Sequence, residues 1–180
     1  VRLSVVDGER LTWVARAQGA RQGLRYDPDM GSDARLSCSS SGWAWLSTMS
    51  DDEALALVAR QGIGQPEQFG PAAPATLQAV LAAVQATRER GYSLTTDTYT
   101  PGLSAISAPV RFAGQPAFGV LTIAGPTVRF HAERMAALGP ELVATAQQLA
   151  TLSGASPFFQ LTAETGKSAP ADGRKPIYAV

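Results

Sequence analysis

The chain has 180 residues, of which 45% are hydrophobic and 17% charged, and its 15 basic side chains balance 15 acidic ones. Such a chain is long enough for one globular domain with a sizeable core, and its single cysteine excludes an internal disulfide. No apolar run approaches the length of about 20 residues that a membrane span needs, and the neutral charge with scattered arginines disfavours a surface that grips DNA phosphates.

The chain begins with the pattern of a β-hairpin. Apolar and polar residues alternate over residues 1–15 on both sides of Asp7-Gly8, which is a strong short-range hairpin signal. Residues 18–33 are polar and contain glycine and proline, so they indicate a loop with one short strand near Leu24–Tyr26.

Three helices are predicted next, and each has a recognisable start or end. A Ser/Gly turn opens the first, a Ser-Asp-Asp-Glu capping box opens the second, and arginines followed by glycine close the third. These helices run from Ser39 or Ser41 to Leu46, from Ser50 to Gly62 and from Thr76 to Arg90. Residues 63–74, between the second and third helices, are rich in proline and indicate an ordered loop or lid.

The second half of the chain predicts three strands and a closing helix. The strands are expected at about residues 92–97, 104–112 and 116–124, with a tight turn at Ala113-Gly114. A last helix is expected over residues 132–153, where Gly139-Pro140 must kink or divide it. This order of elements predicts an α+β domain with a mostly antiparallel central sheet flanked by helices.

No catalytic or metal-binding set emerges from the sequence. Cys38 and His131 are the only residues of their kinds, and a triad of Ser41, His131 and Asp97 lacks the Gly-x-Ser-x-Gly turn that would support it. One histidine and one cysteine do not make a typical zinc site, and no nucleotide-binding glycine pattern is present. We therefore expect no enzyme and no cofactor, with a small hydrolase built on Ser41 or Cys38 as the least favoured alternative.

Three stretches instead resemble the walls of a small-molecule pocket. They are the Ser/Gly turn and helix at Cys38–Leu46, and two strand-like runs at Gly102–Val110 and Leu121–Pro126. The turn offers backbone N–H groups, which suit a carboxylate, and the strands offer hydroxyls and little bulk. The alternative is that the serines only cap the helix.

The order and spacing of these stretches resemble the effector-binding domain of the IclR family of bacterial transcriptional regulators. In that family the blocks read roughly small-x-small-Gly-Lys-x-x-Leu, Gly-Val-x-x-Ile-Ala-x-Pro-Val and an apolar strand ending Ser-Gly-Pro. The resemblance covers about Val1 to Gly154. It implies a GAF-like sheet, and it implies that an N-terminal winged helix-turn-helix is missing from this chain, which is expected to be a truncated fragment.

The resemblance also implies the position of the effector site. In the family a carboxylate-bearing effector sits against the turn and against side chains of the later strands. The corresponding residues of this sequence are Ser40, Ser41, Gly42, Trp43, Thr95, Asp97, Ala105, Thr122 and Ala124.

The sequence departs from the family pattern at several of these positions. Family members often carry Lys in place of Trp43, a polar residue in place of Ala105, and Ser in place of Thr122 and Ala124. Because polar groups of the family pattern are exchanged for apolar ones in this sequence, a larger effector is expected, such as an aromatic or otherwise apolar carboxylate. Arg25 or Arg35, in the loop before the turn, is a further candidate carboxylate partner.

The sequence thus predicts a cytoplasmic effector-binding domain over residues 1–156, followed by a C-terminal tail at 157–180. The expected partners are a small carboxylate effector, DNA only through the missing N-terminal domain, and further copies of the chain in a homodimer or homotetramer, with no membrane. A stand-alone GAF-like sensor with a different output remains an alternative. The full-length reading frame would distinguish the two.

The first testable expectation is that this chain does not bind duplex DNA specifically. Its arginines are scattered, its formal net charge is zero, and it shows no helix-turn-helix candidate. A gel-shift experiment with the natural promoter at moderate salt measures this property. Submicromolar, sequence-selective binding by these 180 residues would contradict the expectation.

Overall fold

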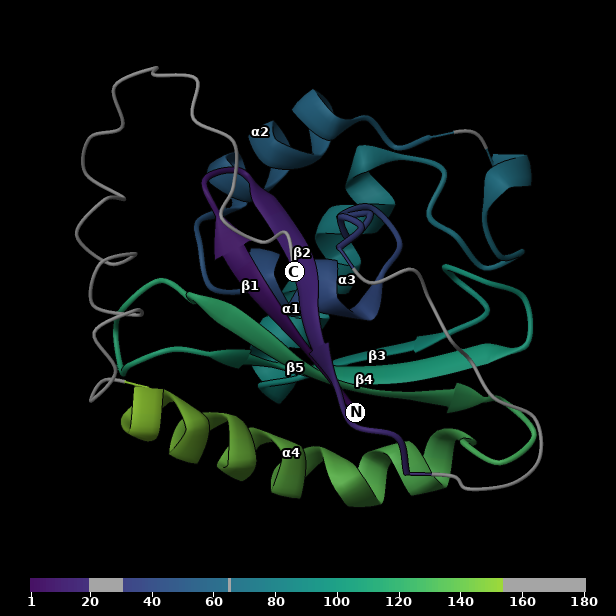
Figure 1. The fold of residues 1–180 in the computed structure, drawn as a ribbon. Helices are drawn as coiled ribbons and strands as arrows, with labels where there is room; N and C mark the ends of the chain where they lie inside the picture. Colours follow the sequence, from purple (N-terminus) through teal and green to yellow (C-terminus); the bar gives the residue numbers. More distant parts are fainter. Residues whose placement is uncertain (20–30, 65, 154–180) are drawn as a thin grey trace.

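A five-stranded antiparallel sheet forms the centre of the molecule, which is described here by a computed structural model (Figure 1). The structure describes residues 1–19, 31–64 and 66–153. The strand order is β2-β1-β5-β4-β3, so the N-terminal hairpin pairs with the last strand. The strands are β1 (Arg2–Asp7), β2 (Arg10–Arg16), β3 (Ser93–Thr96), β4 (Leu103–Val110) and β5 (Gly119–Pro126).

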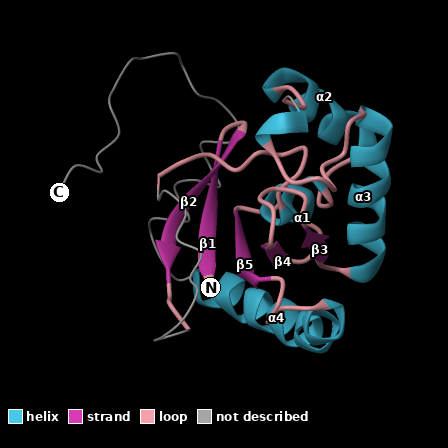
Figure 2. Cartoon of the chain, turned by 90° about the vertical axis from the view of Figure 1, so that its right-hand side faces the viewer, coloured by secondary structure: helices cyan, strands magenta, loops and turns pink. Residues whose placement is uncertain are grey.

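Helices cover both faces of this sheet. In Figure 1 the last helix runs below the strands, while the first three helices lie above them, and Figure 2 shows the same two sides after a quarter turn. The helices are α1 (Ser40–Leu46), α2 (Asp51–Gln61), the 3-10 turn η1 (Pro66–Gln68), α3 (Leu77–Arg90) and α4 (Ala132–Ser153). Two separate hydrophobic clusters result, one on each side of the sheet.

The predicted α+β fold class, with an antiparallel sheet between helices, is confirmed. The later strands begin or end one to three residues from their predicted limits, which is the usual uncertainty of boundaries read from sequence. The 3-10 turn at Pro66–Gln68 was not predicted. The expected short strand near Leu24–Tyr26 and the expected tail at 157–180 lie outside the described residues.

The last helix is not divided, contrary to one of the two predicted outcomes. Pro140 lies inside an uninterrupted α4, where its ring removes one backbone hydrogen bond. The neighbouring Gly139 has a packing role, because a Cβ at this position would overlap the ring of Tyr92. The Gly-Pro pair therefore lets the helix lie close to the sheet edge at Tyr92, at the cost of local helix propensity.

Helix α1 is short, and every one of its residues is buried. Ser39 is its N-cap, with the side chain accepting a hydrogen bond from the backbone N–H of Gly42 (3.0 Å). Gly42 is required by close approach, since a Cβ there would lie 2.7 Å from Cα of Leu36 and 2.9 Å from its carbonyl oxygen. The Ser/Gly composition of the turn thus seats the helix start against the preceding chain.

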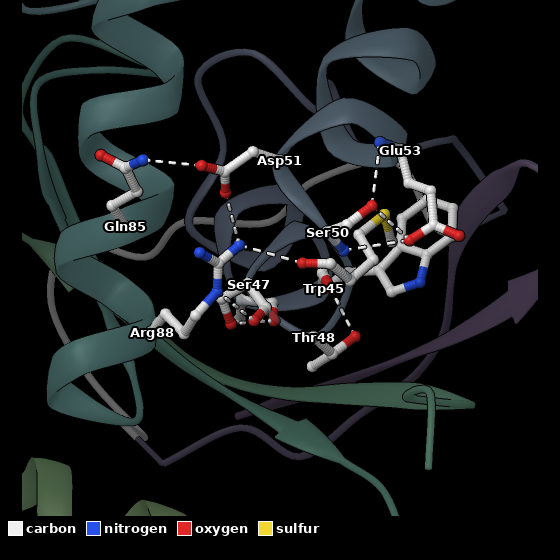
Figure 3. Close-up of polar contacts among 10 residues, drawn as sticks. Trp45, Ser47, Thr48, Ser50, Asp51, Glu53, Gln85 and Arg88 are labelled. Atoms are coloured by element: carbon white, nitrogen blue, oxygen red, sulfur yellow. Dashed lines mark hydrogen bonds and ion pairs between the residues drawn. The ribbon is translucent and has the colours of Figure 1, made fainter. Parts of the chain in front are cut away.

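The other end of α1 is held by Arg88 of α3 (Figure 3). Its guanidinium donates to the carbonyl oxygens of Ser47 (3.2 Å) and Met49 (2.9 Å), which follow the helix, and pairs with Asp51 at 2.9 Å. The Gln85 amide and then Arg88 hold the pKa of the Asp51 carboxyl below its usual value. The predicted capping box of Ser50 and Glu53 is present beside this contact and starts α2.

Because backbone atoms meet the position of a Cβ at residue 42, the Gly42→Ala variant is expected to lose about 1–3 kcal/mol of unfolding free energy. Urea titration followed by circular dichroism measures the loss. Gly125→Ala is the matched control, because its Cβ would meet only the Cβ of Phe130 at 3.7 Å, an ordinary contact. Equal stability of the two variants would show that the turn has room for a side chain.

Candidate functional site

A small cavity lies between the start of α1 and the sheet. Its wall comes from β1, β2, the turn before α1, β3 and the residues after it, and the facing parts of β4 and β5. The lining residues are Arg2, Trp13, Ser39, Ser40, Ser41, Thr95, Thr98, Tyr99, Leu103, Ala105, Thr122 and Ala124. The volume of this cavity is about 30 Å³.

Strand pairing builds the sheet side of this cavity from two neighbouring rows. One row joins Thr95, Ala105 and Ala124, which are direct partners across β3, β4 and β5. Because residues two apart on a strand share a face, the next row presents its side chains to the same side of the sheet. Small side chains in the first row leave the space that the cavity occupies.

The second row is polar throughout. Ser93 pairs with Ser107, Ser107 with Thr122, and Thr122 with Arg2, so that four strands contribute one polar residue each. All four side chains are buried. Only Thr122 and Arg2 of this row reach the cavity wall.

Ser40 of α1 joins this row from above. Its hydroxyl lies 2.6 Å from the Ser93 hydroxyl and accepts a hydrogen bond from Ser107 at 2.9 Å. The Ser93 hydroxyl also donates to the backbone carbonyl of Ser40 (2.8 Å), and Ser107 lies 2.8 Å from the Thr122 hydroxyl. Hydroxyl groups thus bind the helix start to the sheet in a continuous buried chain, which satisfies polar groups that would be costly to bury alone.

Aromatic rings form another side of the cavity. The ring of Trp13 meets Tyr99 edge to face at 6.0 Å, and Tyr99 stacks on Phe69 at 6.1 Å. The guanidinium of Arg2 lies over Trp13 (5.9 Å) and that of Arg35 over Phe69 (5.6 Å). Phe69 lies in the segment that the sequence predicted as an ordered loop or lid, so this segment packs on a residue of the cavity wall.

Arg2 carries the only charged side chain among the described residues that line the cavity. It is buried, with 9% of its surface exposed. A buried guanidinium favours an anionic neighbour, and an arginine binds a carboxylate with two parallel hydrogen bonds where the geometry permits. The cavity therefore combines one positive charge with several hydroxyls.

Of the nine residues predicted for the site, six lie on the cavity wall. These are Ser40, Ser41, Thr95, Ala105, Thr122 and Ala124. The structure does not bring the other three there. The indole of Trp43 points into the core, where its N–H donates to the carbonyl of Ser37 (3.0 Å). Gly42 packs against Leu36, and Asp97 accepts a hydrogen bond from the N–H of Gly102 in the turn after β3.

Sequence reasoning missed half of the wall. The missed residues are Arg2, Trp13, Ser39, Thr98, Tyr99 and Leu103. A signal existed for Trp13, which shares the apolar face of the second hairpin strand with Leu11, whereas the same alternation assigns Arg2 to the polar face. Only the pairing of β1 with β5 brings the hairpin to the cavity. Arg35, proposed as a carboxylate partner, instead donates to the carbonyl of Gln61. Arg25 lies outside the described residues.

The structure does not bring Cys38 and His131, the candidate catalytic pair, together. Cys38 precedes α1 on one side of the sheet, whereas His131 starts α4 on the other side and is exposed. Burial raises the pKa of the Cys38 thiol to about 11, which leaves little of the nucleophilic thiolate at neutral pH. Within the described ranges, no cluster of three or more histidine, cysteine or acidic residues has the arrangement of a metal site.

The described residues thus form an α+β domain with a small polar cavity under a short helix. The chain matches the family model described as bacterial transcriptional regulator IclR C-terminal over residues 1–151, and it belongs to that family. The resemblance read from the three sequence blocks is thereby confirmed.

Curated relatives are transcriptional repressors. The acetate operon repressor of Salmonella typhimurium is 26% identical over 131 residues, which cover 73% of this chain and 47% of the relative. The HTH-type transcriptional repressor AllR of Escherichia coli K12 is 21% identical over 154 residues, covering 86% of this chain and 55% of the relative. The chain thus spans about half the length of the curated relatives it matches.

Solved structures share the fold. A transcriptional regulator from Rhodococcus sp. RHA1 superposes with a TM-score of 0.73 at 24% identity, covering 83% of this chain and 60% of that one. The inducer-binding domain of PobR from Acinetobacter, a double mutant in complex with 3-hydroxybenzoic acid, superposes with a TM-score of 0.71 at 23% identity. That alignment covers 84% of this chain and 87% of the PobR domain. In the described part of the present chain, none of the helices combines the length and the apolar character needed to span a membrane.

The raised pKa of Cys38 gives a direct test of the thiol's role. Compared with the ordinary value of 9.0, a pKa of about 11 lowers the thiolate fraction about 100-fold near neutral pH. Iodoacetamide is therefore expected to label the folded protein at least that much more slowly than the protein unfolded in urea. Rapid labelling of the folded chain would contradict this expectation and favour the alternative of a hydrolase built on Cys38.

Proposed function

We propose that this domain binds a small organic acid in the cavity under α1 and that binding regulates a DNA-binding module attached to it. The observation that carries the proposal is the position of Arg2, a buried positive charge on the wall of a cavity otherwise lined by hydroxyl, aromatic and small side chains. Membership of the IclR family supports the regulatory role, since relatives are named as repressors.

The carboxylate is proposed to lie between Arg2 and the turn that starts α1. Ser39 and Ser41 line the cavity there, with their hydroxyls 3.4 Å apart. The positive guanidinium and a hydroxyl donor together compensate the loss of carboxylate hydration on burial. Ser39, Ser41 and the neighbouring Ser40 all line the cavity, which supports this position for the carboxylate.

The volume of the cavity favours a compact effector. The expectation of an aromatic or otherwise apolar acid rested partly on Trp43, whose ring lies in the core rather than in the cavity. A larger acid requires Tyr99 and the Phe69 ring stacked on it to move outward, after which Trp13 would flank the ligand. The PobR domain, which shares the fold, is complexed with an aromatic hydroxy acid, so both size classes belong in a ligand screen.

Regulation needs a difference in effector affinity between two arrangements of the full-length protein. The cavity joins the hairpin, α1 and the central strands, so a ligand that tightens it would shift these elements relative to one another. We propose that this shift is passed to N-terminal DNA-binding domains within a homodimer or homotetramer. The stand-alone sensor with another output stays as the alternative, and the full-length gene distinguishes them.

A screen of organic acids by thermal shift tests the effector site. An acid present at 100 times its dissociation constant adds about 2.7 kcal/mol, a shift of several degrees for a domain of this size. Ala105→Arg fills the cavity and is expected to abolish the shift. Its control is Ala136→Arg, on the exposed side of α4 beyond the sheet. If the same acid stabilises both variants equally, the acid binds elsewhere and the proposed site is wrong.

Self-association of the chain is a separate expectation, and the structure changes which exposed residues support it. Helix α1 offers no exposed apolar surface for it, because Trp43, Trp45 and Leu46 are all buried within one chain. The remaining basis is the hairpin, where Val14 of β2 is 52% exposed. Analytical ultracentrifugation is expected to show a dimer or tetramer at concentrations on the order of tens of micromolar. A monomer throughout that range would count against it.

A further inference from the structure

The threonines of the cavity wall donate their hydroxyl protons to hydrogen bonds within the protein. Each hydroxyl carries one proton and two lone pairs, so a hydroxyl that donates inside the protein can only accept on its other side. Thr98 donates to the carbonyl oxygen of Cys38 at 2.7 Å, and Thr95 donates to that of Ala105 at 3.2 Å. Both side chains are buried, so breaking these bonds would leave a carbonyl with a lost partner.

The Thr122 hydroxyl also donates its proton within the protein, and its acceptor is Ser107. The Ser107 hydroxyl donates its single proton to Ser40 (2.9 Å). The contact of 2.8 Å between Ser107 and Thr122 can then form only with Thr122 as the donor. Ser107 is the only hydrogen-bond partner of the Thr122 hydroxyl among the described residues. The proton of Thr122 therefore points away from the cavity, and its lone pairs remain for a ligand.

The turn that starts α1 has the opposite character. Ser39 accepts from the N–H of Gly42, and one of the two hydroxyls of Ser39 and Ser41 donates to the other. One proton of this pair is left for a ligand. Arg2 and this pair therefore supply hydrogen-bond donors to the cavity, whereas the hydroxyls of the three threonines supply only acceptors.

We propose that the effector is an acid with a second, hydrogen-bond-donating group, such as a hydroxy acid, and that Ser107 is a specificity-determining residue that sets this preference through Thr122. The inference rests on the proposed function, because the carboxylate defines which end of the ligand meets Arg2. The donor of the ligand then faces the threonine lone pairs. An oxo acid of the same shape offers only lone pairs there, and two sets of lone pairs repel.

The reason for a strong preference is the burial of both partners. A site built to pair with a hydroxyl discriminates sharply against an analogue without one, because polar groups of the site and ligand are left unpaired away from water. Ser107 does not line the cavity, and it is fully buried behind Thr122. It acts by fixing the direction in which the Thr122 hydroxyl donates.

Matched ligand pairs test this polarity. The probes are lactate against pyruvate, 2-hydroxybutyrate against 2-oxobutyrate, and 3-hydroxybenzoate against 3-fluorobenzoate as the larger pair. Dissociation constants are measured on the 180-residue chain by isothermal titration calorimetry. In at least one pair the hydroxy acid is expected to bind about tenfold or more tightly than its partner.

Three variants then separate positioning from general stability. Ser107→Ala frees the Thr122 proton for the ligand, so the preference for the hydroxy acid is expected to fall to about threefold or less, mainly because the oxo acid binds better. Thr122→Ser keeps the hydroxyl bonded to Ser107 and is expected to retain the preference. Thr96→Val, at a position adjacent to Thr95 and hence on the opposite face of β3, is the matched control with an unchanged ratio.

The ratio of two ligands within one variant is insensitive to a uniform loss of stability, so a structural role of Ser107 alone would not move it. Acids that bind without preference in the native chain, or an unchanged ratio in Ser107→Ala, would overturn the inference and leave the acid site standing. Failure of every acid to bind would instead reject the proposed function, and this inference with it.

Discussion

The contact between Ser40 and the hydroxyls of Ser93 and Ser107 is the constraint on which the rest of the site depends. It ties a seven-residue helix, too short to be stable by itself, to the middle of the sheet. The helix has no exposed residue, so each polar group at its start needs a partner inside the protein. Serines supply these partners on both the helix and the strands. Where their row meets the smaller side chains of Ala105 and Ala124, the packing stays open and the cavity forms.

This arrangement links the cavity to parts of the chain that are far apart in sequence. Arg2 enters from the N-terminal hairpin because β1 pairs with β5, and Arg88 of α3 fixes the far end of α1. A ligand that contacts Arg2 and the start of α1 would therefore join the hairpin to the central strands. In a regulator, such a joint can favour one arrangement of the attached domains, provided that the ligand binds that arrangement more tightly. The family model describes the C-terminal part of bacterial transcriptional regulators, and a curated relative is named an HTH-type transcriptional repressor, so the proposed coupling would serve transcriptional regulation.

Local patterns predicted most of the fold and part of the site. The capping box at Ser50, the alternation around Asp7-Gly8 and the glycine after Arg90 are signals carried by neighbouring residues, and each corresponds to an observed element. The family blocks located Ser40, Thr122 and Ala105, which line the cavity. Trp43 lies in the core and not on the cavity wall, and the sequence could not separate the two positions because a seven-residue helix buried on all sides gives no periodicity. Arg2 was missed because its place on the cavity wall depends on the pairing of β1 with β5, which no local pattern records.

The most direct test of the central claim is an assigned amide spectrum of the chain, recorded by ¹H–¹⁵N NMR during titration with the acid that binds most tightly. The account predicts that saturable shifts concentrate on Arg2, Ser41, Thr95 and Thr122, with the exposed residues of α4 unchanged. Saturable shifts confined to α4 or to the loop before α3, with the cavity residues unmoved, would contradict it.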